Sequence, residues 1–474
     1  MSITIEDISV FCKKKGFVYP SSLIYGGMSG FWDYGPLGAE LFNNIKANWW
    51  KFFVQDREEM VGIDASIISH PRTWKASGHL ESFSDVSIQC KKCKKINKVD
   101  KADVGKVKCE FCNGELDTST AKELKLLFPT EVGAGENRTT AYLRGETAQG
   151  MFLDFKLISE TARVKLPFGI AQVGKCFRNE IAPRDFLFRS REFTIGEFEF
   201  FIHPEEKKCN LLDKAHLDVE LRLLDAETQD KGKDTLKKTT IGKMLKEKRF
   251  EEWHAYWLAE QLMWFKQLGL DENKLKVREH KKSELSHYSS ATFDFDYEYP
   301  FGSKEVAGNA NRGQYDLNQH VKESKEKLEI FDEATKKKVI PRVIEPTFGM
   351  DRVFLAVLVN SYNDDKKRGN IVLKLHPKLA PIKVGIFPLV NKLNDDARKV
   401  YETLKKEFTC QFDSSGSVGR RYARADEIGI PYCITFDFDS LNDKSVTIRN
   451  RDDTTQIRVK IDELKDTLRK LLNP

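Results

Sequence analysis

Arginine, phenylalanine and glutamate residues alternate in two extended segments near the middle of the chain. Residues 168–178 and 191–203 are rich in strand-forming residues and are joined by a short polar loop, which predicts an antiparallel hairpin. Side chains two positions apart in a strand share a face, so Arg178 and Glu180 should point the same way. On the returning strand, one face should carry Phe193, Ile195, Glu197 and Glu199.

This face of the hairpin combines groups that bind phosphates and acids. A planar guanidinium binds a phosphate or carboxylate through two hydrogen bonds, and a phenyl ring can stack on a purine. Arg189 and Arg191 lie at the turn side of the same unit. The face could therefore hold a nucleotide and an acid together. An ordinary exposed sheet face with cross-strand ion pairs is an alternative of equal weight.

A second segment with polar groups at suitable spacing covers residues 344–352, Ile-Glu-Pro-Thr-Phe-Gly-Met-Asp-Arg. It should run from a strand into an apolar helix, with Pro346 near the first helical turn. Arg352 would then lie one to two turns into the helix, and Glu345 just before it. A packed helix whose arginine pairs with a neighbouring acid is the alternative.

Four of the nine cysteines form a CxxC-x15-CxxC pattern, namely Cys90, Cys93, Cys109 and Cys112. The other five are scattered, which favours reduced thiols and one metal site over a disulfide framework. Two such pairs match a zinc ribbon with a structural Zn²⁺, because four thiolates leave no open coordination position. Eight lysines lie between Cys90 and Cys109. They could contact nucleic-acid phosphates, or they could belong to an ordinary solvated loop. They are Lys91, Lys92, Lys94, Lys95, Lys98, Lys101, Lys106 and Lys108.

The elements that must position these groups can be predicted from periodicity. A glycine-rich stretch over residues 22–38 precedes an apolar stripe at spacing of four, formed by Leu37, Leu41, Ile45 and Trp49. This predicts a long amphipathic helix that begins near Pro36. Residues 60–68 should be extended and end at Pro71.

Two further patterns lie between the hairpin and the 344–352 segment. Residues 204–290 are lysine-rich, with helical spacing from Trp253 through Trp257 to Trp264. In residues 293–299, aromatic and acidic residues alternate, which predicts a strand with one aromatic and one acidic face.

Length and composition predict more than one domain and no membrane span. The chain has 474 residues, and its charge of 78 − 72 = +6 does not by itself indicate a nucleic-acid partner. No uninterrupted run of about 18 apolar residues occurs, and the N-terminus lacks the features of a secretory signal. We expect a cytoplasmic protein.

Composition changes near residue 380, where strands and helices begin to alternate. We predict an α+β protein with a large domain over residues 1–380 and an α/β domain over residues 381–474. Within the large domain we expect a zinc-ribbon-like insert over residues 88–115 and a helical, lysine-rich insert over residues 205–290.

Taken together, the segments resemble the class II aminoacyl-tRNA synthetases. Phe177–Glu180 and Arg189–Phe193 look like the second signature motif of that family, and Gly349–Arg352 looks like the third. The segment from Leu37 to Pro71 takes the place of the first motif, a dimer-interface element in the family. Each motif is weak alone, but three in order are specific.

Longer strings are similar to those of the glycine-specific, single-polypeptide group of the family. They are spread over most of the chain outside residues 205–290. The matching strings are Trp32–Gly38, Ala76–His79, Leu143–Gly150, Phe177–Glu197, Asn311–Arg312, Val343–Arg352 and Asp413–Arg424.

The resemblance implies a class II catalytic domain with an antiparallel sheet flanked by helices, and a C-terminal anticodon-binding domain. It implies activation of glycine by ATP to glycyl-adenylate, followed by transfer to the 3′ end of tRNA(Gly), with release of pyrophosphate and AMP. The implied partners are glycine, ATP with Mg²⁺, tRNA(Gly) and a second copy of the chain. Arginines that could contact tRNA in the C-terminal domain are Arg420, Arg421, Arg424, Arg449 and Arg451.

The resemblance also implies roles for individual residues. Arg178 would bridge the substrate carboxylate and the α-phosphate, and Phe193 would stack on adenine. Arg189 and Arg352 would neutralise the outer phosphates together with Mg²⁺. The implied catalytic residues are Arg178, Glu180 and Arg352. The implied ATP-binding residues are Arg178, Asn179, Glu180, Phe188, Arg189, Arg191, Glu192, Phe193, Glu305, Val306, Gly349, Met350, Asp351 and Arg352.

Glycine has no side chain to bind, so its pocket must hold the ammonium group and exclude larger residues. Glu146, Glu197 and Glu345 match the acidic positions of the family, and Thr347 stands where serine is usual. The glycine-binding residues implied by the resemblance are Lys98, Glu146, Phe193, Glu197, Arg312, Glu345, Thr347 and Gly349.

Some positions depart from the family pattern. Gly145 replaces the usual proline, Thr194–Gly196 differs from the common bacterial form, and Lys98 stands where an arginine is usual. Two alternatives stay open: a synthetase for serine, proline or threonine, and a nucleic-acid-binding relative that has lost the chemistry.

Overall fold

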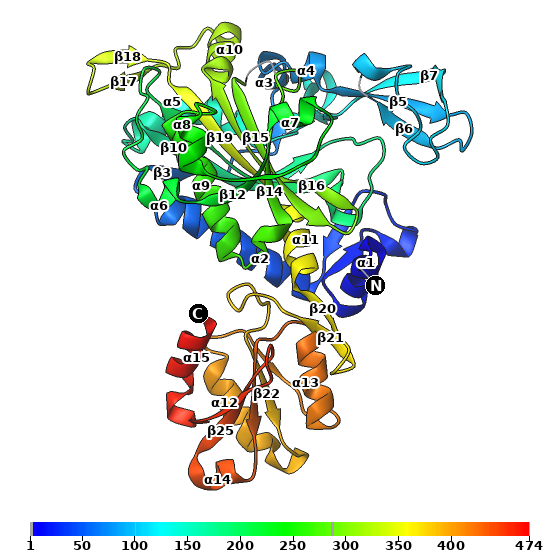
Figure 1. The fold of residues 1–474 in the computed structure, drawn as a ribbon, viewed down its shortest axis with the longest axis vertical. Helices are drawn as coiled ribbons and strands as arrows, with labels where there is room; N and C mark the ends of the chain where they lie inside the picture. The colour runs from blue at the N-terminus through cyan, green and yellow to red at the C-terminus, as the bar shows by residue number, and fades with distance from the viewer. Residues whose placement is uncertain (1–2, 100, 286–288, 474) are drawn as a thin grey trace.

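The computed structural model describes residues 3–99, 101–285 and 289–473 (Figure 1). A large N-terminal unit, built around one long sheet, lies above a smaller C-terminal unit (Figure 1). Within the described residues, nine strands form the large sheet in the order β13-β12-β14-β15-β16-β19-β11-β10-β3. Their bounds are β3 Met60–Gly62, β10 Phe168–Phe177, β11 Glu192–Ile202, β12 Glu220–Leu224, β13 Lys237–Thr240, β14 Leu275–Glu279, β15 Ala291–Tyr299, β16 Gly302–Gly313 and β19 Arg342–Gly349.

The sheet is mostly antiparallel, as predicted. Among the described strands of this sheet, only the β3–β10 and β12–β14 pairs run parallel. The predicted hairpin is confirmed as β10 and β11, which pair antiparallel from Phe168↔Phe201 to Phe177↔Glu192. Arg178 and Glu180, predicted within the first strand, instead follow its end at Phe177. The Arg178 N–H still donates to the carbonyl of Arg191 at 2.9 Å, so one more bond extends the ladder before the chain turns.

Aromatic side chains attach helices to one face of this sheet. The helices on that face are α2 Pro36–Trp50, α9 Glu252–Gln267 and α11 Met350–Ser361. The Phe198 ring of β11 lies 6.2 Å from Trp49 of α2 and 4.6 Å from Trp257 of α9, measured between ring centroids. The predicted helix starting at Pro36 is thus confirmed, with Leu41, Ile45 and Trp49 buried.

The opposite face is covered by α5 Ala148–Thr161 and α10 Tyr315–Ser324. Phe155 of α5 lies 4.5 Å from Phe201 of β11. Since successive side chains of a strand alternate between faces, Glu197 and Glu199 point to this second side, opposite to Phe198. The carboxylates are therefore held between the sheet and α5 and α10.

The segment around Pro346 differs from its prediction. Pro346 lies inside β19, paired with Asn309 of β16, and α11 begins only at Met350. The ladder between β19 and β11 omits Glu345 and Pro346, because proline has no N–H to donate. Arg352 is consequently in the first turn of α11, and Glu345 is a strand residue four positions before its N-cap, Gly349.

The lysine-rich segment over residues 205–290 is not purely helical. It contains α6 Lys214–Leu217, α7 Ala226–Asp230, α8 Ile241–Lys246 and the predicted helix α9, but also β12, β13 and β14. These strands extend the central sheet beyond β15, the predicted aromatic and acidic strand. Leu221, Leu223 and Val277 are buried in the same core as α9. The segment therefore enlarges the central sheet and the core beneath it.

The four-cysteine segment forms a separate small sheet in the order β6-β5-β7. Its strands are β5 Ser84–Cys90, β6 Ile96–Val99 and β7 Leu116–Lys125, so the sheet extends beyond residues 88–115 at both ends. It projects from the large unit beside α3 Pro71–Ala76 and α4 His79–Ser82 (Figure 1).

Smaller elements complete the large unit. They are α1 Ile5–Lys15, β1 Val18–Pro20, β2 Trp32–Tyr34, β4 Ile68–Ser69, β8 Phe128–Val132, β9 Thr139–Leu143, β17 Ile330–Asp332 and β18 Lys337–Val339. Pro71, predicted to stop an extended segment, follows β4 and begins α3.

The C-terminal unit has the predicted α/β pattern. Its sheet has the order β23-β22-β24-β25-β26, with β22 Val384–Pro388, β23 Cys410–Phe412, β24 Tyr432–Phe436, β25 Ser445–Asn450 and β26 Gln456–Lys460. Its helices are α12 Asn394–Leu404, α13 Val418–Glu427, α14 Asp439–Asp443 and α15 Leu464–Leu472. The hairpin of β20 Tyr362–Asp365 and β21 Asn370–Leu373 leads into this unit. Among the described residues, no helix combines the length and apolar character needed to cross a bilayer.

Candidate active site

Arg178 lies between two aromatic rings at the end of the hairpin. Its guanidinium carbon is 5.2 Å from the centre of the Phe83 ring and 5.3 Å from that of Phe193. Its Nε donates to the carbonyl oxygen of Gly145 at 3.0 Å. Stacking and this one bond fix the plane of the guanidinium and aim its remaining N–H groups. The arrangement can bind an oxyanion next to a planar base.

Glu180 lies beside Arg178 and receives positive charge from two sides. Its Oε2 is 4.0 Å from Nζ of Lys98 and 3.9 Å from Nε of Arg189. Lys98 belongs to β6 of the cysteine sheet and also pairs with Asp85 at 2.7 Å. The structure therefore places Lys98 beside Glu180, at the end of the hairpin.

Arg352 occupies the other end of this surface. Its guanidinium carbon lies 4.4 Å from the centre of the Phe188 ring, and its Nη1 lies 3.2 Å from Oε2 of Glu305. Gly349 lies against the side chain of Arg352, because a Cβ added at Gly349 would come within 3.1 Å of Cδ of Arg352. Glycine at the helix N-cap thus leaves room for the folded-back arginine.

Two residues implied as ATP ligands have hydrogen-bond partners within the protein. Arg191 donates from Nη1 to the carbonyl of Ser29 at 2.8 Å and from Nε to that of Glu180 at 3.1 Å. Asp351 is buried and accepts from the hydroxyl of Tyr34 at 2.6 Å and the N–H of Thr194 at 2.5 Å. Through these bonds, Arg191 and Asp351 connect the segments that form the site.

The other implied ATP residues take varied positions. Val306 and Met350 are fully buried in the apolar core. Glu192 pairs with Lys175 at 3.1 Å, and the N–H of Asn179 donates to Leu126 at 2.8 Å. None of these four side chains is paired with the arginines described above.

The implied glycine pocket is brought together on the second face of the sheet. Glu197 accepts from the hydroxyls of Thr147 at 2.5 Å and Thr347 at 2.8 Å. Glu345 accepts from Nη1 of Arg312 at 2.5 Å. Glu146 bonds Nε2 of His79 at 3.1 Å. Three carboxylates from a loop and two strands thus converge, each with its own partner.

Arg312 does not lie open to substrate. It is 3% exposed and donates from Nε and Nη2 to the two oxygens of Asp316 at 2.8 Å each. With its third bond to Glu345, the guanidinium orients that carboxylate. Arg312, implied as a glycine-binding residue, therefore lies beneath the pocket.

Burial and partners set the charge of these carboxyl groups. Burial raises the pKa of Glu197, and the nearby Glu146 raises it further. Burial opposes ionisation of Glu146, but His79 and Arg312 outweigh it and keep the pKa of Glu146 well below its usual value. Since the pocket holds more carboxylates than cations, a bound ammonium group would relieve their repulsion.

Sequence analysis missed several residues that build this pocket. They are His79, Thr147, Gln149, Glu199 and Asp316. His79 and Gln149 lie in strings that resemble the family, yet spacing alone gave them no role. Glu199 was placed on the correct strand face, but its neighbours could not be known. Arg312 lies at the end of β16 and Asp316 in the first turn of α10, so their ion pair forms across the turn between a strand and a helix and no helical spacing reveals it.

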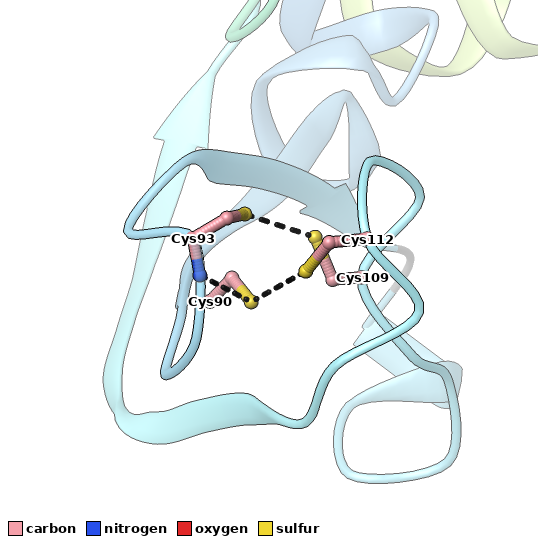
Figure 2. A group of neighbouring side chains, drawn as sticks. All are labelled: Cys90, Cys93, Cys109 and Cys112. Atoms are coloured by element: carbon pink, nitrogen blue, oxygen red, sulfur yellow. Dashed lines mark hydrogen bonds between the residues drawn. The ribbon is translucent and has the colours of Figure 1, made fainter.

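The four predicted metal-ligating cysteines face one another across the small sheet (Figure 2). Sγ of Cys90 lies 3.5 Å from that of Cys112, and Sγ of Cys93 lies 3.6 Å from that of Cys109. Tetrahedral zinc with bonds of about 2.3 Å places sulfurs roughly 3.8 Å apart, so the spacing fits. A Cβ added at Gly114 would come within 3.3 Å of two of these sulfurs.

The arginines of the C-terminal unit divide into buried and exposed groups. Arg421, Arg449 and Arg451 are 2%, 6% and 1% exposed, so they serve the interior of the unit and not a surface. Arg449 makes a two-bond pair with Asp426 at 2.8 and 2.9 Å. Arg420 is exposed, and Arg424 pairs with Asp413.

Comparisons with known proteins cover almost the whole chain. A protein named glycine–tRNA ligase from Acetivibrio thermocellus is 43% identical, with 97% of each chain covered. Proteins of the same name from Caldanaerobacter subterraneus subsp. tengcongensis and Geobacillus thermodenitrificans are 42% and 41% identical; the matches cover 100% and 99% of this chain, and 99% and 98% of those proteins.

Two further comparisons concern the fold. Residues 383–471 match a family model described as anticodon binding domain. A solved structure of prolyl-tRNA synthetase from Cryptosporidium parvum, complexed with halofuginone and AMPPNP, is similar with a TM-score of 0.60. It covers 99% of this chain and 77% of that chain at 14% identity, which supports the α+β fold.

Proposed function

The chain belongs to the glycine–tRNA ligases, and on that premise we propose which of its side chains bind glycine and ATP. The enzyme is a class II aminoacyl-tRNA synthetase. It uses ATP to convert glycine to glycyl-adenylate with release of pyrophosphate, and then transfers the glycyl group to the 3′ end of tRNA(Gly) with release of AMP. The buried carboxylates beside Arg178 and Phe193 are the observation that carries our assignment.

We assign the reacting end of ATP to Arg178. The bond from its Nε to Gly145 holds it next to Glu146, so its remaining N–H groups can reach both the glycine carboxylate and the α-phosphate. Holding nucleophile and electrophile in line contributes several kcal/mol to lowering the barrier, as a rough estimate. Glycine's own carboxylate attacks phosphorus, so no covalent enzyme intermediate is needed. Phe193 would stack on adenine.

The outer phosphates would lie between Arg189 and Arg352. Both guanidiniums are partly exposed, and within the described residues each forms an ion pair with one carboxylate, Glu180 or Glu305, so they keep positive charge for the leaving pyrophosphate. Glu180 would orient Arg189 and Lys98. Mg²⁺ accompanies ATP and shares the phosphate charge.

We place the ammonium group of glycine among Glu146, Glu197 and Glu345. The hydroxyl of Thr347 orients Glu197. Selectivity would then come from steric exclusion more than from attraction. Arg312 is a positioning residue for Glu345 in this scheme.

ATP–pyrophosphate exchange across the twenty amino acids tests the assignment. We expect exchange with glycine alone. Exchange driven by serine or proline but not glycine would contradict the pocket. Failure of the purified protein to charge tRNA would favour the alternative in which the fold has lost its chemistry.

We propose a structural Zn²⁺ held by the four cysteines of Figure 2. The N–H groups of Lys92 and Cys93 donate to Sγ of Cys90 at 3.3 and 3.5 Å, a pattern that stabilises a thiolate. When bound, zinc would join the β5–β6 turn to the segment before β7. The exposed lysines around it could contact the tRNA acceptor arm.

We further propose that residues 1–380 form the catalytic domain and residues 381–474 the anticodon-binding domain. The exposed Arg420 is a candidate contact to the anticodon, whose unstacked bases are read by hydrogen bonds and stacking. No disulfide occurs among the described cysteines, which supports a reducing compartment such as the cytoplasm.

We also propose that the enzyme is a homodimer through the first-motif segment. Exposed apolar side chains gather where this segment meets α5: Ile68 is 48%, Leu153 44% and Leu157 61% exposed. Ile68 and Leu153 line a common cavity of about 220 Å³. In the described part of the chain, β3 pairs only with β10, so the sheet has an open edge beside this patch.

A further inference from the structure

Glu199 is a buried carboxyl group for which the reaction scheme gives no role. It lies in β11, two residues after Glu197, and is 0% exposed. Neither of its carboxyl oxygens has a hydrogen-bond partner among the described residues. A buried ionised carboxylate without partners is costly, so either a proton or a cation must compensate it.

Cross-strand register places Glu199 opposite Glu345. Glu197 pairs with Thr347 and Phe200 with Ile344, so Glu199 faces Glu345 across the stretch that Pro346 interrupts. One oxygen from each of Glu197, Glu199 and Glu345 lies within 4.8 Å of the other two. Like charges directly opposite each other on adjacent strands repel.

The surrounding groups show which carboxyl keeps its charge. Glu345 on β19 bonds Arg312 of β16, whose other bonds go to Asp316 of α10. Glu197, on the same strand as Glu199, is satisfied by two threonine hydroxyls. Glu146 and His79 pair with each other farther along the pocket, and His320 of α10 bonds Gln149.

Burial raises the pKa of both Glu199 and Glu345; the nearby Glu345 raises that of Glu199 further, and Glu197 and Glu146 raise that of Glu345 further. Arg312 lowers the pKa of both carboxyl groups, but its hydrogen bond goes to Glu345, whereas neither oxygen of Glu199 has a partner among the described residues. The unsatisfied Glu199 is therefore the better place for a proton.

We propose that Glu199 is a positioning residue whose protonated carboxyl group donates toward Glu345 and fixes the Glu345–Arg312 pair in the geometry that receives the ammonium group. The inference rests on the proposed glycine pocket and adds a neutral acid beneath it. A neutral Glu199 also keeps the charge of the cluster low enough for one monovalent ammonium to compensate. The carboxyl thus limits repulsion without a second cation.

Two substitutions separate this role from a charged one. Glu199→Ala removes the donor, so the KM for glycine in pyrophosphate exchange should rise about tenfold or more. Glu199→Gln retains size and a donor without charge, and should restore the KM to within about threefold of wild type. If Glu199→Gln raised the KM for glycine as much as Glu199→Ala does, a negative charge would be required at this position. If Glu199→Ala left the KM unchanged, Glu199 would have no positioning role. Either result overturns the proposal.

Thermal unfolding against pH gives a readout independent of catalysis. A buried acid with a raised pKa stabilises the fold below its unfolded pKa of about 4.5, and that contribution is lost as pH rises toward the folded value. Wild type should therefore lose stability relative to Glu199→Gln between pH 5 and pH 8, with a growing Tm difference of about 2 °C or more. A constant or reversed difference would contradict the proposal.

Glu197→Gln distinguishes failure of this inference from failure of the pocket assignment. It removes a charge proposed to contact glycine, so the KM for glycine should rise at least tenfold. An unaffected Glu197→Gln enzyme would refute the pocket itself. A strong effect there, combined with a failed rescue by Glu199→Gln, would refute only the role of Glu199.

Discussion

At the scale of single residues, Arg178 shows how aromatic contacts aim a charged group. Phe83 and Phe193 fix its plane, and Gly145 accepts one of its N–H groups. Arg178→Ala should reduce glycine-dependent pyrophosphate exchange by at least about 10³-fold, a loss at the upper end of that for one transition-state donor. Binding of tRNA, measured by filter retention, should change by less than about threefold.

Arg138→Ala is the matched control for this substitution, because Arg138 is exposed and pairs with Glu131 at the surface. It should exchange pyrophosphate at the wild-type rate. If Arg178→Ala retained exchange, the assignment of the second motif would be wrong. Loss of tRNA binding would instead indicate a folding defect.

Residue types could be predicted from sequence more reliably than residue partners. Arg178 lies beside Phe193, and Glu197 lies close to Glu345, as expected. Arg191 looks equally suitable for phosphate, yet it bonds two backbone carbonyls. The partner of an arginine depends on which loop passes it in space, and sequence spacing contains no such information.

At the scale of secondary-structure elements, a buried charge network joins α6 to α9. His216 bonds Oε1 of Glu260 through Nε2 at 2.8 Å and Asp213 through Nδ1 at 2.6 Å, and Glu260 also pairs with Arg57. The hydrogen bond to Glu260 is the main cause of a raised pKa at His216. The network attaches the segment of residues 205–290 to the end of the first-motif helix.

This network predicts a pH-dependent stability. Because the pKa of His216 is raised on folding, its contribution is complete below about pH 6.5 and declines as pH rises through the folded value. His216→Gln should therefore lower the free energy of unfolding by about 1.5–3 kcal/mol at pH 6, and by less at pH 8.5. Urea unfolding at both pH values measures this; equal losses would contradict it.

A second prediction for a single element concerns zinc binding by the small β6-β5-β7 sheet. Cys90→Ser should release about one equivalent of zinc per chain, and Lys98 should lose its position beside Glu180. The zinc content per chain and the rate of pyrophosphate exchange should both decrease. The control is Cys410→Ser, outside the cluster, which should keep its metal. Wild-type protein without metal would refute the zinc site.

Helices with a clear apolar stripe were predictable, whereas short strands of the long sheet were not. The stripe of α2 and the tryptophans of α9 specify their buried faces directly. Strands β12 and β13 are short, and β13 contains two lysines, Lys237 and Lys238. Only the pairing of β12 with β14, and of β13 with β12, reveals their place. Pro346 suggested a helix start, but a gap in one ladder lets it stay inside β19.

At the scale of the whole molecule, the two units are joined by hydrogen bonds as well as by the chain. Lys15 of α1 pairs with Glu427 of α13 at 2.5 Å. On the large-unit side of the junction, Nδ2 of Asn44 in α2 donates to the carbonyls of Leu379 at 3.1 Å and Ala380 at 3.2 Å. The change in composition near residue 380 is the basis of the proposed domain boundary. The contacts across it could not be predicted, because they connect residues hundreds of positions apart.

The exposed patch of Ile68, Leu153 and Leu157 predicts assembly into a dimer. Apolar side chains that are half exposed in one chain become buried when a second copy covers them, which contributes about 25 cal/mol per Å². Leu157→Glu would place a charge in that interface. Sedimentation should show a dimer for wild type and mostly monomer for this variant.

A surface change elsewhere separates the interface from a general effect of added charge. Val10 of α1 is 51% exposed and lies outside the patch, so Val10→Glu should remain dimeric. A wild-type monomer, or a Leu157→Glu variant that stays dimeric, would refute this surface. Because α5 follows directly after Glu146 and carries the patch on its outer side, loss of the dimer should also raise the KM for glycine. That coupling would identify the second copy as a support for the substrate pocket.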